Sequence, residues 1–259
     1  MLPALFALGG ALAILVVRVV PYQASAVPWA LTWQYLILGF LACGLVISVA
    51  LKRSSRVVWE ALLTVAAFLG VWYVILLLGV PVGWSIGIAS LLTLAHLFLR
   101  VVALHDLFFL LGCVGVTLNF ALWLPSEVLL VALAVFTIYD MIAGPPGGPI
   151  VALAETLVRH GFVPGFILPA RLKGLWSDVD TAVRSRAAML GTGDLILPLM
   201  LVARAAVWGT VEAAFVLAGL LLGAVVLSHR KDLHPRAALV PLAVGAVVPF
   251  LAVYLTIAL

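Results

Sequence analysis

The feature that most constrains the fold is a succession of apolar runs, most of them long enough for a bilayer-spanning helix, with short polar breaks between them. Hydrophobic residues make up 66% of the chain and charged residues only 9%, and the mean hydropathy is +1.32. Water-soluble domains do not have this composition, so the sequence predicts an integral membrane protein. The runs lack the alternating pattern of outer-membrane barrel strands and therefore predict helices.

Breaks rich in polar residues, proline or glycine divide the chain into nine predicted spans within a single membrane domain, residues 1–259. The weakest break, between the fourth and fifth spans, has Arg100, His105 and Asp106 as its polar residues. The opening run lacks a basic segment before it and a clear cleavage site, so it predicts a span rather than a signal peptide. The nine predicted spans are residues 2–20, 29–51, 57–80, 84–99, 104–123, 126–144, 187–207, 210–228 and 237–258.

The basic residues support this division, because Lys and Arg collect in the cytoplasmic loops of membrane proteins. With nine spans, 12 of the 14 Lys and Arg residues fall on the face that holds the N-terminus, and only Arg18 and Arg204 fall on the other. The sequence therefore predicts an all-α membrane protein with its N-terminus in the cytoplasm and its C-terminus outside. The net charge of +4 is explained by these loops and calls for no nucleic-acid partner.

One predicted cytoplasmic connection is long, residues 145–186, and its opening prolines and glycines end the sixth span. Residues 150–159 have the pattern of a short amphipathic helix, and residues 165–169 that of an extended apolar strip. A loop of this length in so compact a protein is usually functional or disordered, and its apolar content argues against full disorder.

Two aspartates lie inside otherwise apolar stretches of predicted spans, Asp140 in the sixth and Asp194 in the seventh, whereas Glu60 and Glu212 lie near span ends. A carboxylate within a bilayer is costly, which makes each acid a candidate functional residue. At 1.5 Å of rise per helical residue, Asp140 is predicted roughly 6 Å and Asp194 roughly 10 Å from the cytoplasmic ends of their spans. The two carboxyls can then face each other, and Gly191 and Gly193 would let another backbone approach Asp194 closely.

Two neighbouring carboxyls suit an aspartic hydrolase. They do not both ionise readily, so one keeps its proton and polarises the scissile carbonyl while the other acts as general base on a shared water. Because the pair titrates together, the two roles are not assigned to Asp140 and Asp194 individually. The sequence contains no H-E-x-x-H zinc motif, G-x-S-x-G motif or Walker loop, so neither a metal nor another cofactor is expected.

Tyr139-Asp140 and Gly191-Thr192-Gly193-Asp194 resemble the YD and GxGD motifs of the presenilin and signal peptide peptidase family of intramembrane aspartic proteases. Leu153-Ala154-Glu155 and Phe166-Ile167-Leu168-Pro169 are similar to the segment that follows the YD motif in prokaryotic, archaeal-type members. The nine spans, the long loop and the N-terminus-inside orientation also look like presenilin. The resemblance implies catalytic roles for Asp140 and Asp194, with Tyr139, Gly191, Thr192 and Gly193 as supporting residues.

The third motif of that family, Pro-Ala-Leu at the start of the last span, is not literally present. The nearest segment includes Leu239, Val240, Pro241 and Leu242, and we expect it at nearly the depth of the two aspartates. A proline at this place is expected to free carbonyls and kink the helix where a substrate strand could pair. The resemblance thus makes these four residues candidates for substrate binding.

The resemblance implies that the protein hydrolyses peptide bonds in transmembrane segments of other proteins, lies in the cell membrane, and contacts lipid. Extended backbone survives in a membrane only if it is paired or buried, so an unwound substrate is expected to add as a strand near Pro241 or residues 162–170. The alternatives are a proton- or ion-coupled secondary transporter that uses the same two aspartates, and a non-catalytic protein that binds membrane helices. The sequence leaves open whether the protein acts as a homo-oligomer.

Overall fold

The computed structural model describes most of the chain. The described residues are 1–19, 56–144, 148, 151, 155, 157–158, 163, 165–185, 187–229 and 238–258. The second predicted span, residues 29–51, lies outside them, as do most of the predicted amphipathic helix at 150–159 and the segment Leu153-Ala154.

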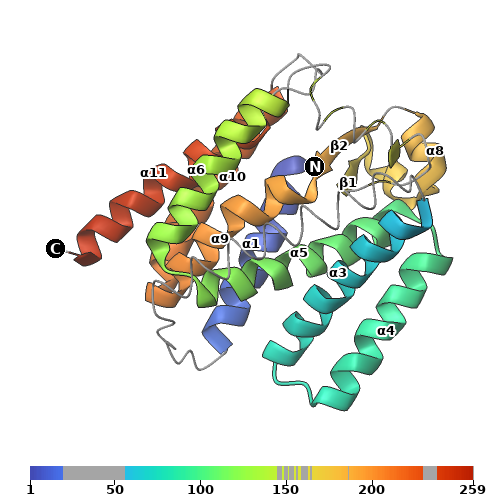
Figure 1. The fold of residues 1–259 in the computed structure, drawn as a ribbon, viewed down its shortest axis with the longest axis horizontal. Helices are drawn as coiled ribbons and strands as arrows, with labels where there is room; N and C mark the ends of the chain where they lie inside the picture. The colour runs from blue at the N-terminus through green and yellow to red at the C-terminus, as the bar shows by residue number, and fades with distance from the viewer. Residues whose placement is uncertain are drawn as a thin grey trace.

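The described part of the chain is a bundle of helices that follows the predicted spans closely (Figure 1). Six of its helices are long and apolar enough to cross a membrane, and α4 is a shorter apolar helix. The helices that correspond to predicted spans are α1 (Leu2–Val19), α3 (Arg56–Leu77), α4 (Val82–Phe98), α5 (Val102–Trp123), α6 (Ser126–Ala143), α9 (Thr192–Trp208), α10 (Thr210–His229) and α11 (Leu239–Ala258).

Helix α9 lies at the centre of the bundle, because α1, α5, α6, α10 and α11 all pack against it. A helix that is apolar on every side is buried on every side, and α9 follows this rule. Its fully buried side chains are Leu195, Leu199, Leu201, Val202, Ala203, Ala205 and Ala206. Among the described helices that correspond to predicted spans, α9 is therefore buried along most of its length.

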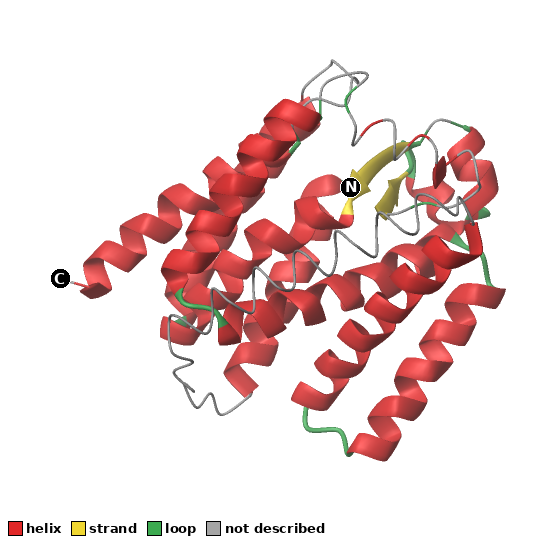
Figure 2. Cartoon of the chain, viewed as in Figure 1, coloured by secondary structure: helices red, strands yellow, loops and turns green. Residues whose placement is uncertain are grey.

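The start of that span differs from the prediction. Residues 188–191 form strand β2 (Ala188–Gly191), which pairs antiparallel with β1 (Gly165–Leu168), and α9 begins only at Thr192. Figure 2 shows these two strands in yellow at one end of the bundle, beside the first turn of α9. The expected extended strip at 165–169 is confirmed as β1, and pairing with it holds residues 188–191 in an extended conformation.

A second, smaller core lies beside β1. Val102 of α5, Ile167 of β1 and Val179 of helix α8 (Val179–Arg184) are all buried there, while Phe166 packs into the main core. Successive residues of a strand point to opposite sides, so β1 is packed on both of its faces. Between β1 and α8 the chain forms a short 3-10 helix, η1 (Leu172–Trp176).

The two basic residues predicted on the non-cytoplasmic face lie near helix ends and have polar partners. Arg18, at the end of α1, donates to the Thr210 hydroxyl at 2.8 Å. Arg204 of α9 donates to the Ser126 hydroxyl at the start of α6 at 3.2 Å. The ends of α1 and α9 and the start of α6 lie at the end of the bundle opposite β1 and β2 (Figure 1), while the side of the membrane that each end faces stays a prediction.

Candidate active site

Asp140 lies in the last turn of α6, as predicted. The helix ends at Ala143, and the Gly144 amide closes its last turn by donating to the Asp140 carbonyl at 2.8 Å. The Asp140 side chain is half-buried, and its Oδ2 accepts a hydrogen bond from the backbone N–H of Leu239 at 3.2 Å. Leu239 is the first residue of α11, so the carboxyl of Asp140 ties the end of α6 to the start of the last helix.

Asp194 lies in the first turn of α9, closer to the helix start than predicted. It is the third residue of the helix because residues 188–191 are strand, not helix. Its Oδ2 accepts a hydrogen bond from the backbone N–H of Gly191 at 3.2 Å, as the third residue does in half of a capping box. Each aspartate is thus held by one backbone N–H at a helix end.

The fold brings these two carboxyls together. Helix α6 packs on α9, and α11 packs on both. The carboxyl groups of Asp140 and Asp194 are close enough to interact electrostatically. Two carboxyls in this relation do not both ionise readily, because each charge disfavours the other.

The two glycines before Asp194 differ in what surrounds them. A Cβ on Gly191 would lie 3.1 Å from Asp194 Oδ2, so the missing side chain gives room to the carboxylate itself. A Cβ on Gly193 would have nothing within 4 Å. The space expected for a substrate backbone therefore lies beside Gly193, whereas Gly191 serves the placement of Asp194.

Gly165 faces β2 at very close range. A Cβ on Gly165 would collide with the carbonyl oxygen of Leu190, a backbone atom that cannot move alone. We expect Gly165→Ala to push the strands apart and cost about 1–3 kcal/mol, as overpacking does. Hydrogen exchange at residues 188–191 and the thermal midpoint measure this effect. Gly87→Ala is the control, because a Cβ there would have nothing within 4 Å; equal effects of the two substitutions would contradict the prediction.

The other predicted site residues are distributed around the pair. Tyr139 is 52% exposed on α6, and Thr192 is the partly buried first residue of α9. Leu242 is fully buried in the core, and Val240 is partly buried. The structure thus brings the backbone of Leu239 to Asp140, while the Leu242 side chain packs inside the bundle.

Pro241 does not interrupt a helix as expected. It is the third residue of α11, where a backbone N–H has no partner within the helix, so a proline there removes no helical hydrogen bond. The expectation that it kinks the last span is therefore wrong. A proline that does remove a helical bond is Pro198 in α9, whose missing N–H leaves the carbonyl of Asp194 without its usual donor.

His105 and Asp106 belong near this site, although the sequence marked them only as part of a polar break. Asp106 Oδ1 accepts from the backbone N–H of Ile167 at 2.9 Å, and His105 Nε2 lies 2.9 Å from the carbonyl oxygen of Gly165. Both residues thus hold the outer edge of β1. Their partners lie about 60 residues further along the chain, so no local pattern could have revealed the contact.

Within the described residues, no group of three or more His, Cys, Asp or Glu side chains is arranged to hold a metal ion. His96, a candidate for packing rather than ligation, stacks on Phe108 with ring centroids 4.6 Å apart.

Comparisons with known proteins show the family to which the chain belongs. A family model described as signal-peptide peptidase, presenilin aspartyl protease, matches residues 21–259. Two solved structures of a presenilin family intramembrane aspartate protease, in C222 and P2 space groups, are similar with TM-scores of 0.65 and 0.64 and sequence identities of 22% and 23%. The similarity covers 97% and 98% of this chain and 96% of each solved chain. A search of curated proteins found no match. The chain is therefore a multi-pass membrane protein that belongs to the signal-peptide peptidase and presenilin family of aspartyl proteases.

Proposed function

We propose that the protein is an intramembrane aspartic endopeptidase of the cell membrane that hydrolyses peptide bonds in transmembrane segments of other proteins. The observation that carries the proposal is the electrostatic interaction of the Asp140 carboxyl on α6 with the Asp194 carboxyl on α9, each held by a backbone N–H. Family membership supports the same reaction, and no observation favours the transporter alternative.

In the proposed reaction one carboxyl is protonated and the other is ionised. The ionised carboxylate takes a proton from a water that attacks the scissile carbonyl, and the protonated acid donates to the carbonyl oxygen. The tetrahedral intermediate then collapses as the carboxyl that took the proton from water gives it to the leaving amine, and the other carboxylate takes a proton from a hydroxyl of the intermediate. The Leu239 and Gly191 amides keep the two carboxyls in position, so little reorganisation is needed at the moment of reaction.

The substrate is proposed to bind as an unwound strand on β2. Both edges of β1 already have partners, β2 on one side and His105 and Asp106 on the other, so within the strip predicted from the sequence residues 165–168 favour β2 as the pairing edge. Ile167 lies opposite Met189, and its N–H points away from β2 towards Asp106. In an antiparallel pair, two opposite residues of this kind both point their backbone groups outward, so those of Met189 face the outer side of β2. Among the described strands β2 pairs only with β1, and a strand added there leads towards Asp194.

The proposal is tested by incubating detergent-purified protein with a single-span substrate, with and without a transition-state analogue of aspartic proteases. We expect cleavage within or near the span and its loss with the analogue. Absence of cleavage, together with proton or ion flux in proteoliposomes, would instead favour the transporter. If both assays are negative and the analogue does not bind, the results favour the remaining alternative, a non-catalytic protein that binds membrane helices.

A further inference from the structure

We propose that His105 and Asp106 are positioning residues that fix the β1–β2 ribbon and thereby set the register in which a substrate strand meets the two aspartates. The inference rests on the proposed protease function. Neither residue contacts the reacting groups in the mechanism above, and yet both are polar side chains near the start of an apolar helix. Such residues are costly in a membrane protein, so their partners indicate what they do.

The two side chains bind one edge of one strand. They are consecutive in α5, and their partners on β1 are the Gly165 carbonyl and the Ile167 N–H, two residues apart. Groups of residues i and i+2 in a strand face the same edge, so α5 binds β1 as a neighbouring strand would. Since a carbonyl only accepts, the Nε2 of His105 carries the hydrogen in this contact.

The ribbon needs such an anchor. Each strand has four residues, and the strands are joined through η1 and α8 rather than by a tight turn. A two-stranded ribbon of this length is marginal by itself. A slip by one residue would also exchange the faces of β1, moving Phe166 out of the main core and Ile167 out of the small one.

The connecting segment is anchored at the same place. Arg100, between α4 and α5, forms a bidentate pair with Asp180 at 2.9 and 3.2 Å, and Val101 forms a β-bridge with Asp178. The Val179 N–H donates to the Arg100 carbonyl at 2.9 Å. The junction between α4 and α5 thus holds both β1 and the chain that leads from β1 to β2.

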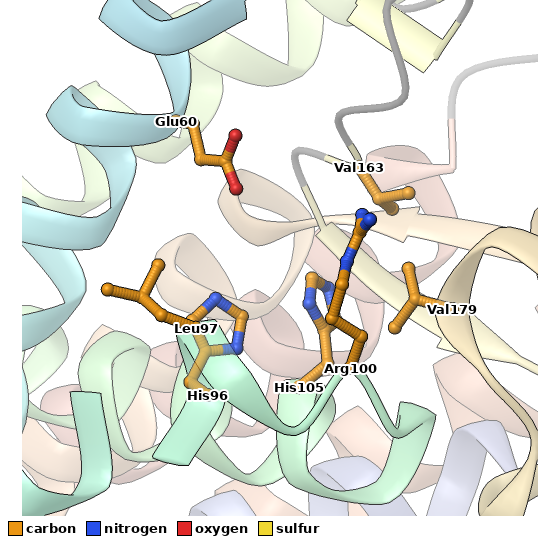
Figure 3. Close-up of a pocket in the computed structure, with 7 residues that line it drawn as sticks. All are labelled: Glu60, His96, Leu97, Arg100, His105, Val163 and Val179. Carbon is orange, nitrogen blue, oxygen red and sulfur yellow. The ribbon is translucent and has the colours of Figure 1, made fainter. Parts of the chain in front are cut away.

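A small cavity beside this junction offers a matched control. Figure 3 shows His96, Arg100 and His105 around it, and its volume is about 40 Å³. The rings of His96 and His105 lie 5.2 Å apart, but among the described residues the buried Nδ1 of His96 has no hydrogen-bond partner, and no described hydrogen bond joins His96 to β1. A change at His96 therefore alters the same surroundings without removing a contact to the ribbon.

The ribbon connects these residues to the active site. Gly191, the last residue of β2, donates its N–H to Asp194, and a substrate strand on β2 would be placed by the Met189 backbone. If β1 is free to shift, β2 shifts with it, and a different substrate bond comes to the two carboxyls. Loss of the anchor is thus expected to change where the substrate is cut as well as how fast.

The experiment compares Asp106→Leu and His105→Leu with Asp106→Asn and His105→Gln. Asparagine keeps an oxygen that accepts from Ile167, and glutamine keeps an N–H that donates to Gly165. Hydrogen exchange at residues 165–168 and 188–191 reports the ribbon, and mass spectrometry of products reports the cleavage sites. We expect the leucine variants to exchange roughly tenfold faster in the ribbon and to move part of the cleavage to neighbouring bonds, as loss of a buried hydrogen bond predicts. The conservative variants and His96→Phe are expected to retain the wild-type pattern.

Three results would overturn the proposal. The first is a wild-type exchange rate and cleavage pattern in both leucine variants. The second is an equal effect of the conservative variants, which would show that the hydrogen bonds are not the cause. The third is an equal effect of His96→Phe, which would indicate general loosening. If wild-type protein cleaves nothing while ribbon exchange still rises in the leucine variants, the protease function fails and the anchoring contact alone stands.

Discussion

Asp140→Asn and Asp194→Asn are each expected to lower cleavage of a single-span substrate by at least about 10⁴-fold, because catalytic groups that act as a unit lose most of their effect when one is removed. An amide can neither take the proton from water nor give one to the scissile carbonyl as a carboxyl does. The amide oxygen can still accept a hydrogen bond from the backbone N–H of Leu239 or Gly191, so the helix ends are expected to keep their positions.

The measurement is the initial cleavage rate beside the thermal midpoint of each purified variant. Glu127→Gln is the matched control, since Glu127 lies in the first turn of α6 and accepts from the Tyr254 hydroxyl, far along the helix from Asp140. The control is expected to cleave at nearly the wild-type rate. The double variant Asp140→Asn/Asp194→Asn is expected to be no slower than either single one. A single variant that keeps more than a tenth of the wild-type rate would refute the two-carboxyl mechanism.

The sequence predicted the helices well because hydropathy alone decides them. The predicted spans 104–123, 126–144 and 210–228 differ from α5, α6 and α10 by two residues or fewer at each end. Asp140 was also placed correctly, since the prolines that follow it end α6 in any environment.

The prediction failed where tertiary pairing decides the conformation. Ala188, Met189 and Leu190 are apolar and continue directly into the apolar helix, so hydropathy cannot separate a short strand from a first helical turn. Their extended conformation depends on β1, whose pairing residues lie 20 or more residues away. The contacts of His105 and Asp106 were not predicted for the same reason. The sequence predicted that residues 165–169 are extended, but not that they lie against α5.

The glycine motif could be recognised from the sequence, but the separate roles of its two glycines could not. Both were expected to admit a neighbouring backbone. Around Gly191 the available room is filled by the carboxylate of Asp194, which reaches back to the Gly191 N–H. Only Gly193 keeps open space, and that difference depends on the conformation of a single side chain.

Gly193→Leu is therefore expected to lower kcat/KM by about 100-fold, because the new side chain would fill the space proposed for the substrate and misfit there costs up to about 3 kcal/mol. The free protein is expected to be unharmed. A Cβ at this position meets nothing within 4 Å, and leucine is a better helix former than glycine by roughly 1 kcal/mol. The thermal midpoint should thus stay unchanged or rise while activity falls.

Ala218→Leu is the control for added bulk, since Ala218 is an exposed residue of α10. We expect it to change neither stability nor cleavage. Gly193→Ala should fall between the wild type and Gly193→Leu, because one methyl group fills only part of the space. A Gly193→Leu variant that is stable and cleaves at the wild-type rate would show that the substrate approaches Asp194 from another side. A variant that loses activity and stability together would show that Gly193 serves the fold. Only lost cleavage with intact stability identifies the open side of α9 as the place where a substrate backbone comes within reach of both carboxyls.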